Sequence, residues 1–131
     1  MSAVVDASAV VELLVGSQFA REVDHALGEG AYAPEIIDLE VLQTLRRFER
    51  HGQMEPQVAA LSVRVLGDMP ITRLPHGGLL EDAWAHRKNL SAYDAIYAAL
   101  AARLGIRLIT ADRRLATAPN LGVPVTLIPA T

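Results

Sequence analysis

The sequence contains no cysteine, and lysine supplies only one of its 12 basic residues. Without cysteine there is no disulfide, no thiol nucleophile and no cysteine-ligated zinc, so we expect a protein of the reducing cytoplasm. Long apolar runs are also missing, since none approaches the roughly 18 residues that span a bilayer. The apolar N-terminus carries Asp6 before any basic residue, which is unlike a signal peptide. We therefore expect neither a disulfide scaffold nor a membrane protein.

Histidine motifs and net positive charge are missing as well. The four histidines show neither an HExxH motif nor another paired metal-ligand spacing. The net charge is −3, so the chain lacks the overall basic character of many nucleic-acid-binding proteins. Apolar residues, in contrast, are abundant: they make up 51% of the 131 residues. That is enough for one compact domain, residues 1–131, with a substantial core.

Short apolar runs alternate with longer segments of helical periodicity, which predicts an α/β protein with β-α-β units and a mainly parallel sheet. We expect strands over residues 3–6, 31–34, 70–75, 106–110 and 123–128. Helices are expected over residues 8–15, 18–27, 34–51, 55–66, 79–88 and 92–104, with a helical turn over 113–117. Pro34 suits the first position of its helix, and Gly52 suits its end.

Three aspartates lie where strands end or helices begin. Asp6 and Asp112 each follow a predicted strand directly, and each could simply cap the next helix. Asp94 has a local explanation too, because Ser91 and Asp94 have the spacing of a capping box at the positive end of a helix dipole. These effects also favour the ionised carboxylate, which a metal ligand must be. In a parallel sheet such positions share the edge where ligands bind.

Glu40 is harder to explain by local structure. It shares a helical face with Ile36, Ile37 and Thr44, which should be largely buried, and an unpaired buried carboxylate is costly. Carboxylates gathered at one edge repel one another unless a cation is present, and their hard oxygens suit Mg²⁺ or Mn²⁺. Such an ion can activate a water molecule and stabilise the leaving oxygen of a phosphodiester. We therefore hypothesise one catalytic metal site, formed by Asp6, Glu40, Asp94 and Asp112.

Four segments resemble, in order, the motifs of the PIN-domain ribonucleases, specifically the VapC-type toxins of toxin–antitoxin pairs. They are VVDASAVVELL, APEIIDLEVLQTLRR, LSAYDAIYAALA and LITADRRLA. The resemblance implies a three-layer α/β/α sandwich and a Mg²⁺- or Mn²⁺-dependent endoribonuclease. It implies the same four acids as the site, with the hydroxyls of Ser8 and Thr110 as donors around the metal ligands. It also implies a homodimer silenced by a cognate antitoxin. Gln43 departs from the family pattern, in which asparagine is more usual there.

Arginines offer contacts to RNA despite the acidic net charge. Setting aside the four site acids changes the formal charge from −3 to +1. Arg46 and Arg47 follow Glu40 on the same predicted helix, and Arg113 directly follows Asp112. Because a guanidinium group can bind phosphate through two hydrogen bonds, we predict that Arg46, Arg47 and Arg113 bind the substrate. The alternative is that these residues only form solvated helix faces.

Other functions of an acidic edge fit the sequence less well. A receiver-type phospho-acceptor domain needs an acidic pair near the first strand and a lysine after a late strand, but Asp6 stands alone and Lys88 precedes a helix. A haloacid-dehalogenase-like phosphatase needs Asp-x-Asp, where this chain has Asp-Ala-Ser. A non-catalytic PIN-like domain that binds a partner stays open. Apolar positions over residues 55–66 and 79–84 offer a dimer or antitoxin surface.

Overall fold

A five-stranded parallel sheet forms the centre of the computed structural model, which describes residues 1–130. The strands are β1 (Ala3–Val5), β2 (Ala31–Pro34), β3 (Ile71–Leu74), β4 (Arg107–Thr110) and β5 (Val125–Leu127). They lie in the order β3-β2-β1-β4-β5, so the chain builds one half of the sheet outward from β1 and then returns to build the other. The strand order reverses between β1 and β4, the position at which parallel sheets commonly bind ligands. The predicted strands and their parallel arrangement are confirmed.

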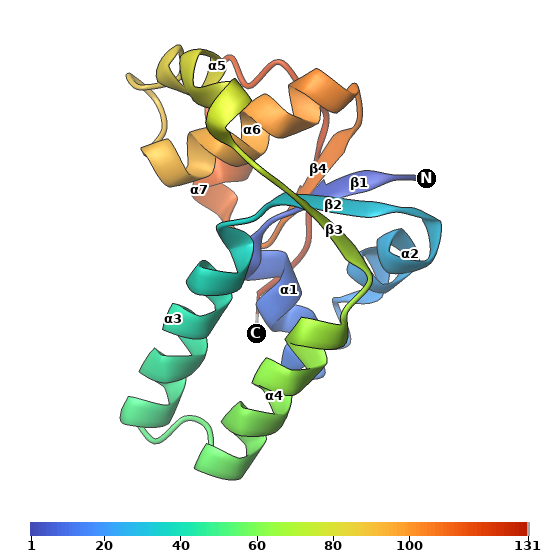
Figure 1. Cartoon of the computed structure of the whole chain (residues 1–131), viewed down its shortest axis with the longest axis vertical. Coiled ribbons are helices and arrows are strands. Elements are labelled where there is room, and N and C mark those ends of the chain that lie inside the picture. The colour runs from blue at the N-terminus through green and yellow to red at the C-terminus, as the bar shows by residue number, and fades with distance from the viewer. Residues whose placement is uncertain (131) are drawn as a thin grey trace.

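Helices cover both faces of the sheet (Figure 1). In chain order they are α1 (Ala7–Leu14), α2 (Arg21–Glu29), α3 (Ile37–Arg50), α4 (Pro56–Asp68), α5 (Leu80–Trp84), α6 (Ala92–Leu104) and α7 (Arg113–Ala116). Helix α6 packs on β1, β2 and β4, whereas α1 and α2 lie on the opposite face. Helices α3 and α4 pack side by side and extend beyond the sheet. The expected α/β/α layering is confirmed.

The two central strands and α6 form the middle of the core. Every residue of β1 is buried, and so are Leu108, Ile109 and Thr110 of β4, as expected for parallel strands covered on both faces. Helix α6 is buried without interruption over residues 95–101, where four alanines let it approach the sheet closely. The core therefore fixes the ends of β1 and β4 and the beginning of α6.

The helix predicted to begin at Pro34 is wrong at its start. Pro34 is the last residue of β2, and the amide of Glu35 continues the pairing by donating to the Leu74 carbonyl at 2.9 Å. Helix α3 therefore begins only at Ile37. Pairing with β3 holds the chain extended here, which overrides the local preference of proline for a first helical turn.

Other helix boundaries differ from the prediction as well. The segment predicted as a helix over residues 79–88 is α-helical only to Trp84, after which successive turns lead to α6. Helix α2 begins at Arg21, later than predicted. Helix α4 continues through Gly67 to Asp68, because its last carbonyls find a donor elsewhere in the fold.

That donor is Arg73 of β3. Its guanidinium group donates to the carbonyls of Leu66 (2.7 Å) and Met69 (2.9 Å) at the end of α4. It also forms a two-nitrogen ion pair with Asp38 at the beginning of α3, with distances of 3.0 to 3.2 Å. One arginine thus satisfies carbonyls that the helix itself cannot and ties α3, α4 and β3 together.

Within residues 1–130, no helix combines the length and the apolar character needed to cross a bilayer.

Candidate active site at the carboxyl edge of the sheet

Asp6 lies at the end of β1 and is the N-cap of α1. Its Oδ1 accepts hydrogen bonds from the Ala9 amide (3.0 Å) and the Ser8 hydroxyl (2.7 Å). Its Oδ2 accepts a short hydrogen bond from the Thr110 hydroxyl at the end of β4. Only 5% of the residue is exposed. The fold therefore buries a carboxylate at the junction of the two central strands and holds it with three donors.

Burial dominates the electrostatics of Asp6. It raises the pKa of this carboxyl group from 3.8 to about 6, although the hydrogen bonds from Thr110, Ser8 and Ala9 oppose the rise. The nearby charge of Asp94 raises this pKa further. Since removal from water disfavours the charged form, Asp6 gains most from a neighbouring positive charge.

The hydroxyls of Ser8 and Thr110 are themselves held by the backbone beyond β4. The Ser8 Oγ accepts a hydrogen bond from the Ala111 amide (2.9 Å), and the Thr110 Oγ1 accepts one from the Asp112 amide (2.9 Å). Each hydroxyl then turns its proton toward Asp6. This network connects the end of β1 to the end of β4 and fixes the orientation of the Asp6 carboxylate.

Glu40 comes from the beginning of α3 and meets α6. Its Oε1 accepts a hydrogen bond from the hydroxyl of Tyr97 at 2.5 Å. The carboxylate is half-buried, and this burial raises its pKa above the usual 4.5, with Asp94 adding to the rise and the Tyr97 bond opposing it. Glu40 therefore faces the same interior region as the acid on α6.

Asp94 lies in the first turn of α6. Its amide donates to the Ser91 hydroxyl at 3.2 Å, so Ser91 caps the helix as the sequence predicts. The Asp94 side chain is half-buried, and burial and the charge of Asp112 raise its pKa, whereas Arg114 lowers it. Asp94 is the acid that the others share, because its charge also raises the pKa values of Asp6 and Glu40.

Asp112 caps the short helix α7. Its Oδ1 accepts from the Arg114 amide (2.9 Å), and its Oδ2 pairs with the Arg114 guanidinium at 3.2 Å. The same Arg114 nitrogen lies 4.0 Å from Asp94 Oδ2. A protein cation thus stands between these two carboxylates, even though the Arg114 side chain is 83% exposed.

The four predicted acids are linked, but they do not form a ready-made coordination shell. Asp94 interacts electrostatically with each of Asp6, Glu40 and Asp112. Among the described residues, however, no three acidic or histidine side chains are close enough together to hold a metal ion as they stand. The donor set is the oxygen-rich kind that suits Mg²⁺ or Mn²⁺, and mutual repulsion of the acids would be relieved by such an ion. The chemistry of the site fits a divalent cation, although the carboxylates would have to rearrange to coordinate it.

Two residues at this edge were not predicted as site residues. Tyr97 is 2% exposed and packs in the core, and its hydroxyl also donates to Glu40. Its position one turn after Asp94 was the available signal. Arg114 is not among the predicted site residues. The predicted substrate-binding residues, Arg46, Arg47 and Arg113, are all exposed.

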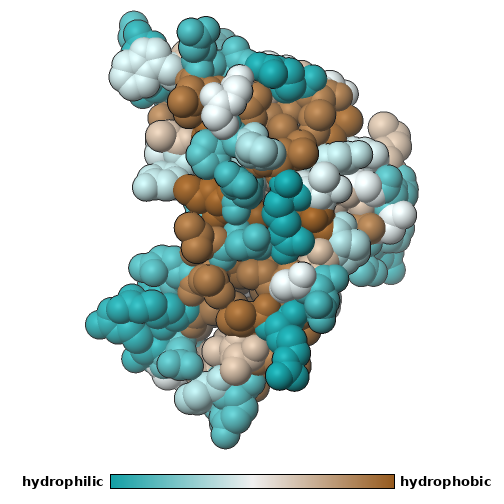
Figure 2. All heavy atoms as spheres, viewed as in Figure 1, coloured by the Kyte–Doolittle hydropathy of each residue, from teal (hydrophilic) through white to brown (hydrophobic). Residues whose placement is uncertain are grey.

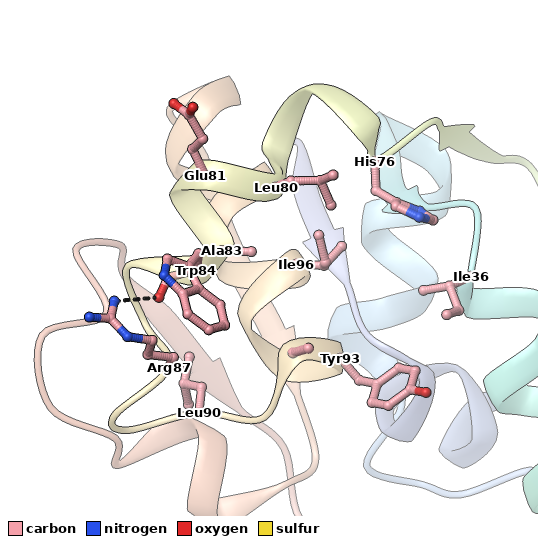
Figure 3. A pocket seen from close by; sticks show the side chains of 11 residues that line it. Ile36, His76, Leu80, Glu81, Ala83, Trp84, Arg87, Leu90, Tyr93 and Ile96 are labelled. Carbon is pink, nitrogen blue, oxygen red and sulfur yellow. Dashed lines mark hydrogen bonds between the residues drawn. The ribbon is translucent and has the colours of Figure 1, made fainter.

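The described part of the structure also has two apolar grooves. The larger, about 1000 Å³, lies between α5, α6 and the beginning of α3 and is lined mainly by apolar residues, including Leu80, Trp84, Tyr93 and Ile96. Figure 3 shows Trp84 on one side of this groove, with Arg87 beside it, and apolar groups of α3 and α6 across from it. Figure 2 shows exposed apolar side chains over α5 and α6.

The second groove, about 600 Å³, lies along α4. Its lining combines Val58, Leu61 and Val65 of α4 with apolar residues of α1 and α2. Val58, Leu61 and Val65 are each 46–58% exposed. Both of the segments that the sequence predicts as partner surfaces therefore present apolar side chains to solvent.

Comparison with known proteins identifies related sequences and structures. The family model of the PIN domain matches residues 3–121. Ribonuclease VapC9 of Mycobacterium tuberculosis is 36% identical over 126 residues, which cover 96% of this chain and 98% of the relative. Ribonuclease VapC1 of the same species is 37% identical over 128 residues, covering 95% and 96% of the two chains.

Solved structures show the same fold. The crystal structure of PAE2754 from Pyrobaculum aerophilum superposes with a TM-score of 0.69 at 25% identity and covers 95% of this chain and 83% of that one. A toxin–antitoxin complex from Klebsiella pneumoniae superposes with a TM-score of 0.65 at 19% identity, covering 95% and 96% of the two chains.

Proposed function

This chain belongs to the PIN domain family, and we propose that it is a divalent-cation-dependent endoribonuclease that acts as the toxin of a toxin–antitoxin pair. The relatives named VapC ribonucleases support this function because the match extends over nearly the whole of both chains. The observation that carries the proposal is the linked set of buried and half-buried carboxylates at the switch point of the sheet. The pKa values of three of the four carboxyl groups are raised, which is costly unless a cation binds.

We propose Mg²⁺ or Mn²⁺ as the cofactor, held by Asp6, Glu40, Asp94 and Asp112. When bound, the ion would supply an activated water and stabilise the leaving oxygen of the phosphodiester. Ser8 and Thr110 orient the Asp6 carboxylate from behind through their hydroxyls. These contacts correspond to the outer-shell donors that commonly hold metal-ligating carboxylates in place.

The substrate side of the proposal concerns the exposed arginines. Arg46 and Arg47 lie along α3, whose first turns carry Glu40, and Arg113 lies on α7 directly after Asp112. Phosphate contacts of this kind place an RNA strand without reading its sequence. We propose that these side chains bind phosphates on either side of the scissile bond.

The two apolar grooves suit the two protein partners. We propose that the α5–α6 groove, which contains Trp84 and Tyr93, mediates homodimerisation, because buried aromatic anchors dominate stable interfaces. We propose that the α4 groove receives the antitoxin, since an apolar helix face and its neighbours can hold an amphipathic segment. We also propose that the protein acts in the cytoplasm, since the chain has no cysteine and the proposed substrate is RNA.

RNA cleavage by antitoxin-free protein tests the proposed function. Wild-type protein is incubated with diverse RNAs in Mg²⁺ or Mn²⁺, beside Asp94→Asn and the control Asp24→Asn, which changes an exposed aspartate of α2. We expect Asp94→Asn to lose more than about 100-fold of the activity with its circular dichroism spectrum unchanged, because it loses a direct ligand of the ion. If the wild-type protein leaves all RNAs intact under both ions, the proposed nuclease function is refuted. That result would favour the alternative of a domain that only binds a partner. Full activity of Asp94→Asn would refute the site alone.

A further inference from the structure

The hydroxyl of Tyr97 lies among the site carboxylates. Tyr97 is 2% exposed, and its ring packs in the hydrophobic core of the protein. Its position is therefore fixed by core packing and not by the site. The hydroxyl donates to Glu40 Oε1 at 2.5 Å. Tyr97 therefore acts as a hydrogen-bond donor to the Glu40 carboxylate.

Glu40 needs such a donor more than the other acids do. Asp6 is held by three donors, Asp94 lies at a capped helix start, and Asp112 is bound by the backbone of α7. Glu40 has a longer side chain with an additional torsion angle, and it comes from α3, whereas its donor comes from α6. The Tyr97 hydroxyl is the partner that the structure gives the Glu40 carboxylate.

We propose that Tyr97 is a positioning residue for cation binding: its hydroxyl holds the Glu40 carboxylate toward Asp6 and Asp94, so that the ion meets all four acids and not only the other three. This inference rests on the proposed function of the site. Tyr97 does not touch the ion itself in this role, and it acts through Glu40. Because the phenol ring is fixed by the core, it also links the placement of α3 to that of α6.

The test is the affinity for Mn²⁺ without RNA, measured by electron paramagnetic resonance of the free ion. Tyr97→Phe removes a single oxygen and keeps the ring. The matched control is Tyr32→Phe, which removes the same oxygen from the partly buried tyrosine of β2. We expect Tyr97→Phe to weaken Mn²⁺ binding about tenfold, the lower range for loss of an outer-shell partner, and Tyr32→Phe to leave it unchanged.

A double-mutant cycle separates positioning from a structural effect. In a Glu40→Gln background, Tyr97→Phe should have no further effect on Mn²⁺ affinity, because the carboxylate that it orients is gone. In the RNA assay, saturating Mn²⁺ should restore most of the turnover of Tyr97→Phe, whereas a lost catalytic group would not be restored. If Tyr97→Phe weakens Mn²⁺ binding by the same factor in the wild-type and Glu40→Gln backgrounds, the inference is overturned. This holds whether or not Tyr97→Phe also lowers the stability of the protein.

The remaining outcomes distinguish the two proposals. If the wild-type protein binds no Mn²⁺ and cleaves no RNA, the proposed function fails. If the wild type binds Mn²⁺ and Tyr97→Phe binds it equally well, the proposed function stands and the role of Tyr97 is refuted.

Discussion

Replacing Asp6 by asparagine should stabilise the cation-free protein at pH 7.5 while abolishing its activity. Burial raises the pKa of Asp6 in the folded protein from 3.8 to about 6. Between these two pH values the folded state keeps a proton that the unfolded chain has already released. The free energy of unfolding therefore falls as the pH rises through this window, and the full cost of the buried charge is present above it.

The size of the effect follows from the two pKa values. A difference of about two units corresponds to roughly 3 kcal/mol at pH 7.5, but to only roughly 1 kcal/mol at pH 4.5, where the folded state is still mostly protonated. Solvent screens little of this cost because Asp6 is 5% exposed. Asparagine can keep the bonds from Ser8 and Ala9 through its amide oxygen, and its amide nitrogen can donate to the Thr110 hydroxyl.

Urea unfolding in the presence of a chelator measures this prediction. Wild type, Asp6→Asn and the exposed control Asp24→Asn are compared from pH 4.5 to pH 7.5. The stability of Asp6→Asn relative to wild type should increase by roughly 2 kcal/mol across this range, whereas that of the control should not change. Adding Mn²⁺ should then stabilise the wild type more than Asp6→Asn. A relative stability that stays constant or decreases as the pH rises would refute the reasoning.

Three further predictions concern residues around the site. Arg73→Ala should lower the free energy of unfolding by about 2–4 kcal/mol, because it leaves helix carbonyls and a carboxylate without their donor; Arg103→Ala, which breaks an exposed ion pair, should cost less than about 1 kcal/mol in the same urea titration. Arg114→Gln should strengthen Mn²⁺ binding about threefold, since an exposed cation no longer competes at the acids; calorimetry should show no change for Arg113→Gln. Trp84→Glu, which puts a charge in the α5–α6 groove, should convert a dimer into a monomer in light scattering.

The arrangement of the sheet could be predicted because each strand is a short apolar run bounded by glycine, proline or a helical segment. Helix α6 was predicted at its true bounds, since Ser91 caps its beginning and Gly105 adopts the left-handed conformation at its end. Pro34 was predicted both to end the strand over residues 31–34 and to begin the next helix, and only the first of these is right. Its conformation is decided by pairing between β2 and β3, and no local pattern reports the partner of a strand.

The site, like the fold, has features that the sequence predicts and features that it does not. The places of Asp6 and Asp112 follow from one rule, that parallel strands end at a common edge. The hydrogen bond between Tyr97 and Glu40 joins residues 57 positions apart on two helices, so it depends on how α3 packs against α6. The bridge from Arg114 to Asp94 and Asp112 depends on one side-chain conformation. The sequence and its family resemblance could supply the acids and the hydroxyls that bind Asp6, but not the partners of Glu40 and Asp94.

The charges of the site and of the rest of the chain together explain how an acidic protein can bind RNA. The formal charge of −3 includes four carboxylates at one edge, where they would repel a phosphate backbone. Three of these carboxyl groups have raised pKa values, so the cation-free site opposes its own ionisation as well as its substrate. In the proposed function, a divalent cation would remove both penalties at once, and the exposed arginines of α3 and α7 would be the charges proposed to meet the phosphates. Cation binding and RNA binding should therefore be thermodynamically coupled, each increasing the affinity for the other.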